Sequence, residues 1–83
     1  MANTTNDVKQ IILDVSQLGG TVDNLSNDSS LDDLNFNNNM CSDLCSRLND
    51  YLQQQGSANT ISSSDVTSDL SVQQIIDMVN QKL

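Results

Sequence analysis

The stretch LNFNNNMCSDLCSRLN, residues 34–49, contains the start of the main predicted helix and shows which face that helix buries. After the asparagines at 37–39, apolar residues recur at helical spacing. This apolar stripe consists of Met40, Leu44, Leu48, Tyr51 and Leu52. Asparagine is a good N-cap because its side-chain oxygen accepts a hydrogen bond from a free first-turn amide. The pattern predicts a helix from about Asn39 to Gln55.

A first helix is predicted over Thr4–Leu18, where Val8, Ile11, Ile12, Val15 and Leu18 recur at helical spacing. Thr4 and Asp7 have the spacing of a capping box. Gly19–Gly20 ends this helix, because glycine accepts the left-handed turn found there. The following residues 21–36 are polar and predict a long loop. Its apolar anchors are Val22, Leu25, Leu31, Leu34 and Phe36.

The carboxyl-terminal third predicts two more helices. Residues 62–65 read SSSD and favour the start of a short helix that carries Val66. The last helix begins after Ser71, with Gln74 at the capping-box position. Its stripe consists of Val72, Ile75, Ile76, Val79 and Leu83. The order predicts one all-α domain over residues 1–83, a small four-helix bundle of three longer helices and one short helix.

Charge restricts the partners that the chain can bind. Eleven aspartates face three basic residues, which gives a net charge of −8. Such a surface repels nucleic acid and anionic lipid and favours basic protein surfaces. Residues 1–7 lack the basic and then apolar pattern of a secretion signal, and no apolar run approaches membrane-spanning length. We therefore expect a cytoplasmic monomer that binds neither nucleic acid nor membrane.

Several segments together resemble an acyl carrier protein of the polyketide-synthase type. Residues 34–40, LNFNNNM, followed by residues 43–49, DLCSRLN, resemble the start of the family's second helix, which usually reads L-G-x-D-S-L-M-x-x-(D/E)-L-x-x-R-L. Residues 8–19 resemble its first helix, and residues 31–34, LDDL, resemble its pre-helix element. Residues 71–76, SVQQII, are similar to the start of its last helix. The resemblance covers nearly the whole chain and implies the same four-helix layout.

The resemblance places the family's attachment serine at Asn38. In that family, 4'-phosphopantetheine is esterified to a serine six residues before a buried leucine that follows an acidic residue, here Asp43–Leu44. A carboxamide cannot accept the phosphoryl group, so no cofactor is expected at Asn38. A one-residue insertion would move the position to Asn39 without changing this conclusion. Asn37 replaces the family's aspartate, and Asn39 replaces its apolar residue.

Two other serines are alternatives for the prosthetic arm. Ser30 precedes Leu31–Asp32 but lies eight residues before Asn38, in the predicted loop. Ser42 lies about one turn inside the predicted helix, away from its free amides. If either serves, or if Asn38 is an engineered replacement of serine, the chain is a working carrier that bears 4'-phosphopantetheine.

The resemblance also implies a docking surface. Carrier proteins of this family bind basic enzyme patches through acidic residues of the second helix. The corresponding partner-binding residues here are Asp33, Asn39, Met40, Asp43, Arg47 and Asp50. The simpler interpretation is a solvated face on which Arg47 pairs with Asp43 four residues away. The implied partners are a ketosynthase, an acyltransferase or similar enzymes.

The sequence predicts neither catalysis nor a metal site. It contains no histidine and no glycine-rich phosphate loop, and Asp32–Asp33 would be adjacent in a solvated turn. Cys41 and Cys45 would share a helix face, but two thiols fall short of a four-ligand zinc site. We expect them to be small, partly buried core residues in a reducing cytosol.

The residues thus lead to one main hypothesis, an acyl-carrier-like domain that does not carry and acts by binding proteins of a polyketide or fatty-acid system. A working carrier protein is the first alternative. An unrelated acidic helical adaptor is the second.

Overall fold

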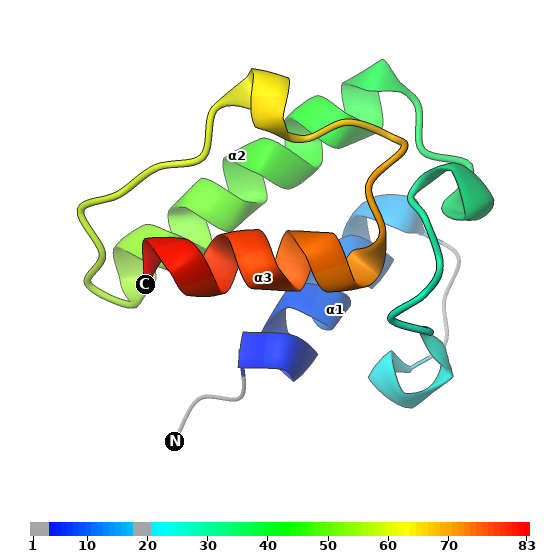
Figure 1. Cartoon of the computed structure of the whole chain (residues 1–83), viewed down its shortest axis with the longest axis horizontal. Helices are drawn as coiled ribbons and strands as arrows, with labels where there is room; N and C mark the ends of the chain where they lie inside the picture. Colours follow the sequence, from blue (N-terminus) through cyan, green and yellow to red (C-terminus); the bar gives the residue numbers. More distant parts are fainter. Residues whose placement is uncertain (1–3, 18–20) are drawn as a thin grey trace.

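The computed structural model describes residues 4–17 and 21–83. This part of the chain is small and mostly helical, with α1 packed against both other α-helices. The α-helices are α1 (Thr4–Ser16), α2 (Asn38–Gln54) and α3 (Val72–Lys82). Short 3-10 turns lie between them: η1 (Val22–Asn24), η2 (Asp32–Leu34) and η3 (Ser63–Asp65). In Figure 1, α2 and α3 are joined by residues 55–71, which lead the chain back along α2.

The short third helix predicted near residues 62–65 is only the 3-10 turn η3. The SSSD pattern does cap this turn, because the Ser62 amide donates to the Asp65 carboxylate at 3.3 Å. The turn stops because Val66 has extended backbone angles. Val66 is buried, so burial of this side chain coincides with the end of the helical turn.

α1 begins at Thr4, as predicted, but its capping and its end differ from the prediction. Thr4 already lies within the helix, so it is not the N-cap. Asp7, the other half of the predicted capping box, instead accepts a hydrogen bond from the Tyr51 hydroxyl at 2.9 Å. The helix ends at Ser16, and Gln17 takes a left-handed φ of 57°. Leu18 and Gly19–Gly20 lie outside the described residues.

The ends of α3 test the last predicted helix. Its capping box is confirmed: the Gln74 amide donates to Ser71 Oγ at 3.2 Å, and the Ser71 amide donates to Gln74 Oε1 at 2.9 Å. Its apolar stripe is buried as far as Val79. The prediction is wrong for Leu83, which follows the end of the helix and is 50% exposed.

The core is aliphatic, because the chain has two aromatic residues among its 83 and must fill its interior with other side chains. Leu44, Leu48 and Leu52 of α2 are fully buried. Fully burying a leucine contributes about 1.5–3 kcal/mol relative to leaving it exposed. The predicted loop anchors are confirmed. Leu25, Leu31 and Phe36 are buried, while Val22 and Leu34 pack at the edge of the core.

The loop before α2 is tied to the segment before α3. The amides of Leu31 and Asp32 donate to the carbonyls of Leu70 and Ser68, each at 2.9 Å. In the other direction, the Val72 amide donates to the Ser29 carbonyl at 2.8 Å. These bonds flank an isolated antiparallel bridge between Ser30 and Ser71. They place the start of α2 relative to α3 despite the length of the loop.

The Asn49 side chain holds the returning segment, residues 55–71, on α2. Asn49 Oδ1 accepts from the Ile61 amide at 2.7 Å, and Asn49 Nδ2 donates to the Ile61 carbonyl at 3.0 Å. The Cys45 thiol also donates to that carbonyl, at 3.4 Å. Ile61 is buried, so its backbone groups need these partners.

We expect Asn49→Ala to lower the free energy of unfolding by about 2 kcal/mol, because it leaves buried backbone groups without partners. Urea unfolding followed by circular dichroism measures this loss. The control is Asn80→Ala, at an exposed position of α3, which should stay within about 0.5 kcal/mol of the parent. Equal effects of the two substitutions would contradict the role given to Asn49.

Candidate functional site

The candidate site is the beginning of α2. Asn37 is the N-cap: its side-chain oxygen accepts from the Met40 amide at 2.9 Å. Asn38 is the first residue of the helix and is exposed. The first intrahelical bond runs from the Cys41 amide to the Asn37 carbonyl at 3.0 Å. The predicted helical start at this position is confirmed, one residue earlier than expected and with Asn37 as the cap.

The chain enters α2 through a fixed turn. Asn35 has a left-handed φ of 62°, a conformation that asparagine tolerates better than most residues. The next residue, Phe36, is buried, and its amide donates to the Leu31 carbonyl at 3.0 Å. The Asn35 amide also donates, to the Asp32 carbonyl at 3.0 Å. This arrangement anchors the backbone just before Asn37 and leaves the next side chains facing solvent.

The register that singled out Asn38 is present in the helix. Asp43 is exposed and Leu44 is fully buried, as the acidic and buried positions of the motif require. Asn38 therefore stands six residues before a buried leucine, at a helix N-terminus. First-turn amides lack intrahelical partners and carry the positive end of the helix dipole, an environment that favours a negative charge.

Most residues of the predicted docking surface share one face of α2. Asn39, Asp43, Arg47 and Asp50 follow one another at spacings of three or four residues and are all exposed. Met40 is half-buried and packs against the core. Arg47 Nε donates to both carboxylate oxygens of Asp43 at 3.3 Å, which confirms the predicted pair. Both side chains are about half exposed, so the pair contributes little to stability.

Asp33 lies apart from that face. It belongs to η2, where its carboxylate accepts from the Ser30 amide at 3.2 Å. Ser30 Oγ in turn accepts from the Asp33 amide at 3.2 Å. The two residues stabilise the turn that leads into α2.

A shallow hollow of about 360 Å³ lies beside Asn38. Its lining combines the start of α2 with the returning segment: Asn38, Cys41, Ser42, Ser63, Ser64, Val66, Thr67 and Ser68. Ser42 is the alternative serine that borders this hollow, one turn into the helix. Sequence reasoning did not place residues 63–68 here, because no local pattern shows that this segment returns to α2.

The two cysteines are free and buried, as predicted. Burial raises the pKa of the Cys41 thiol, and the nearby Asp32 carboxylate raises it further. Burial raises the pKa of the Cys45 thiol in the same way, with a further contribution from Asp65. In the described part of the chain, no three His, Cys, Asp or Glu side chains gather where they could hold a metal.

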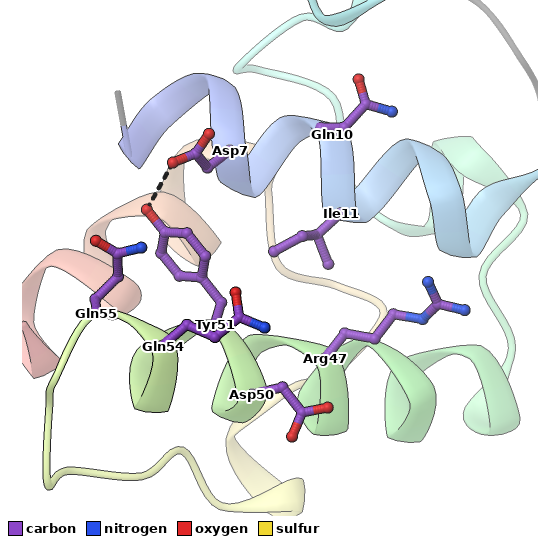
Figure 2. A pocket seen from close by; sticks show the side chains of 8 residues that line it. All are labelled: Asp7, Gln10, Ile11, Arg47, Asp50, Tyr51, Gln54 and Gln55. Atoms are coloured by element: carbon purple, nitrogen blue, oxygen red, sulfur yellow. Dashed lines mark hydrogen bonds between the residues drawn. The ribbon is translucent and has the colours of Figure 1, made fainter. Parts of the chain in front are cut away.

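A second hollow lies between α1 and α2, away from the start of α2. Figure 2 shows Ile11 pointing from α1 toward α2, with the Asp7–Tyr51 hydrogen bond at one end and Arg47 at the other. Burial raises the pKa of Tyr51. Sequence reasoning identified Arg47 and Asp50 as surface residues but missed the hollow that they line together with Asp7, which depends on how α1 crosses α2.

Comparison with known proteins gives no match: no family model, no curated protein and no solved structure matches this chain. None of the helices among residues 4–17 and 21–83 combines the length and apolar content needed to cross a membrane.

Replacing the cap should weaken α2. We expect Asn37→Ala to cost about 1 kcal/mol of stability, because the Met40 amide loses its acceptor. Asn39→Ala is the control: it lies two residues on, within the helix and exposed, and should be close to neutral. Urea unfolding of both variants checks the assignment. A larger loss for Asn39→Ala would show that the helix begins elsewhere.

The raised thiol pKa values predict a loss of stability at alkaline pH. Above the usual thiol pKa of 9.0, the unfolded chain gives up protons that the folded chain keeps, so rising pH favours unfolding. Urea unfolding between pH 8 and pH 10 (about one unit on each side of the ordinary value) measures this. The double variant Cys41→Ala/Cys45→Ala should show a shallower decline. Rapid labelling of the folded protein by a thiol reagent at neutral pH would contradict the burial of these groups.

Proposed function

We propose that this chain is an acyl-carrier-like domain of a polyketide or fatty-acid type biosynthetic system that cannot carry 4'-phosphopantetheine at Asn38 and acts by binding proteins. The observation that supports the proposal is the place of Asn38: it is the exposed first residue of α2, six residues before the fully buried Leu44.

The chemistry of attachment requires an alcohol oxygen at this place. Phosphopantetheine joins a carrier through a phosphodiester, which forms when a serine hydroxyl loses its proton and attacks the phosphorus of coenzyme A that bears the pantetheine, breaking the pyrophosphate bond and releasing adenosine 3',5'-bisphosphate. The helix start favours the negative charge of that phosphate. The Asn38 side chain offers a carboxamide instead, which has no hydroxyl oxygen that can attack phosphorus. We infer that the chain has the helix that would present the phosphopantetheine arm and lacks the hydroxyl oxygen that would bear it.

The alternative serines have less suitable surroundings. Ser30 is engaged in the turn before α2, where its hydroxyl accepts from the Asp33 amide. Ser42 lies a turn inside α2, beyond the amides that would stabilise a phosphate. A working carrier that uses either serine is therefore the alternative that the modification experiment must exclude.

The four-helix layout forms part of this proposal. α1, α2 and α3 correspond in order to the longer helices implied by the resemblance, and η3 occupies the place of the short one. The long loop between α1 and α2 has its predicted place as well. The layout supports a carrier-type bundle in which the short helix is reduced to a single turn.

The proposed partners are enzymes with basic surfaces, such as a ketosynthase or acyltransferase. The face of α2 that carries Asn39, Asp43, Arg47 and Asp50 is exposed and starts next to Asn38. We propose that it docks on such enzymes without a prosthetic arm, so that the domain serves as a scaffold, decoy or regulator rather than as a catalyst. The same proposal makes it a cytoplasmic monomer.

Modification by a permissive phosphopantetheinyl transferase tests this function. With coenzyme A and the transferase, the parent chain should keep its intact mass. Asn38→Ser should gain one phosphopantetheine, because the substitution supplies a hydroxyl at the start of α2. Asn39→Ser, one residue further on, is the matched control and should remain unmodified.

Each other outcome has a defined meaning. Modification of the parent chain would overturn the proposal, and peptide mapping would show whether Ser30 or Ser42 bears the arm. If Asn38→Ser stays unmodified, the flanking residues are restored in Asn37→Asp/Asn38→Ser/Asn39→Leu, in which aspartate still caps the helix. Failure of this triple variant with an intact helix by circular dichroism would favour an unrelated acidic adaptor.

A further inference from the structure

We propose that the groove between α1 and α2 receives a lysine or arginine side chain from a basic segment of a protein partner, with Asp7 as its counter-charge. This inference rests on the proposed protein-binding function and adds a second contact to it, outside the start of α2.

The groove is formed by two helices rather than by one exposed face. It has a volume of about 490 Å³ and lies where α1 crosses the carboxyl-terminal half of α2. Its lining residues are Asp7, Gln10, Ile11, Arg47, Asp50, Tyr51, Gln54 and Gln55. Figure 2 shows Ile11 and Tyr51 between the two helices and the Asp7 carboxylate beside the Tyr51 hydroxyl, whereas Gln10 and Asp50 point away from the opposite helix.

The lining suits a side chain with an apolar stem and a cationic head. Ile11 and the Tyr51 ring provide the apolar part, on which a long alkyl stem packs. Beside them lie the Asp7 carboxylate and the side-chain amides of Gln54 and Gln55, whose oxygens accept hydrogen bonds. Lysine and arginine are the protein side chains that combine these two features.

Asp7 is fixed in position for this role. The Tyr51 hydroxyl donates to one of its carboxylate oxygens at 2.9 Å. A carboxylate accepts several donors, so this bond orients Asp7 and leaves it able to accept from a cation. Tyr51 is only 8% exposed, which gives the pair a rigid base.

Among the described residues that line the groove, Arg47 is the one cation, and its charge is already compensated. Its Nε donates to both oxygens of Asp43. That partner lies outside the lining, and neither of the two lining carboxylates, Asp7 and Asp50, forms an ion pair with Arg47. The local charge is therefore negative, as is the whole chain at −8, and it favours a cationic occupant.

A protein segment fits this groove better than a small molecule does. Small-molecule sites are concave and enclose most of their ligand. Here the rim consists of exposed side chains, among them Gln10, Gln54 and Gln55. Asp50 and Arg47 also belong to the exposed face of α2, so one partner can contact that face and place a basic side chain in the groove.

The test uses the full chain and acetylated tetralysine amide as the probe, at low ionic strength, with binding followed by nuclear magnetic resonance. Three substitutions each remove one negative charge: Asp7→Asn in the groove, Asp43→Asn on the α2 face, and Asp77→Asn on α3. We expect Asp7→Asn to weaken binding several-fold more than Asp77→Asn, because only Asp7 contacts the cation in the groove.

A second matched pair makes the result independent of the Asp7–Tyr51 bond. Gln54 lines the groove, whereas its neighbour Gln53 lies on α2 outside it. Gln54→Lys and Gln53→Lys add the same charge at exposed positions one residue apart. Gln54→Lys should weaken probe binding several-fold more, since its ammonium group competes with the probe.

Equal effects within both pairs would overturn the groove proposal and show that the probe responds only to overall charge. If Asp43→Asn weakens binding while Asp7→Asn matches Asp77→Asn, the groove proposal fails and the docking face of α2 stands. The modification assay at Asn38 decides the carrier-like function separately, so the two failures are distinguishable. If Asp7→Asn unfolds the chain, the comparison of Gln54→Lys with Gln53→Lys decides between the two outcomes.

Discussion

Burial of a single leucine-lined face of α2 determines how the helix presents both its amino-terminal turn and its acidic surface. Leu44, Leu48 and Leu52 are fully buried, so α2 cannot rotate about its axis without exposing them. The same constraint turns Asp43, Arg47 and Asp50 outward. Because the core is thin and aliphatic, these few side chains carry a large share of the apolar stabilisation.

Around this helix, polar side chains hold the segments that lack regular structure. Asn49 binds both backbone groups of Ile61, and Ser57 and Asn59 donate to the Lys82 carbonyl at the end of α3. At the other end of α3, the side-chain amide of Asn27 donates to Gln73 Oε1 at 2.7 Å, beside the main-chain bond from the Gln73 amide to the Asn27 carbonyl at 3.0 Å. The abundance of asparagine and serine thus has a structural use, because their short side chains bond directly to the backbone.

The carrier-like interpretation and the groove proposal concern different parts of α2. The first depends on its amino-terminal turn, where Asn38 offers an amide in place of a hydroxyl. The second depends on its carboxyl-terminal half, where α1 adds Asp7 and Ile11. Under both proposals, the start of α2 offers no phosphoryl acceptor at Asn38, and the acidic surface of the helix binds basic proteins.

The sequence by itself determined the helical class, the bounds of α2 to within a residue, the start of α3, the burial of Cys41 and Cys45, and the position of Asn38 at a helix start. These features depend on local signals: caps and the spacing of apolar residues within one helix. It missed the single-turn form of η3, the exposure of Leu83 and the groove between α1 and α2. Only the tertiary structure decided these, because each depends on which segments distant in the sequence pack together, and a pattern within one helix contains no information about the crossing of another.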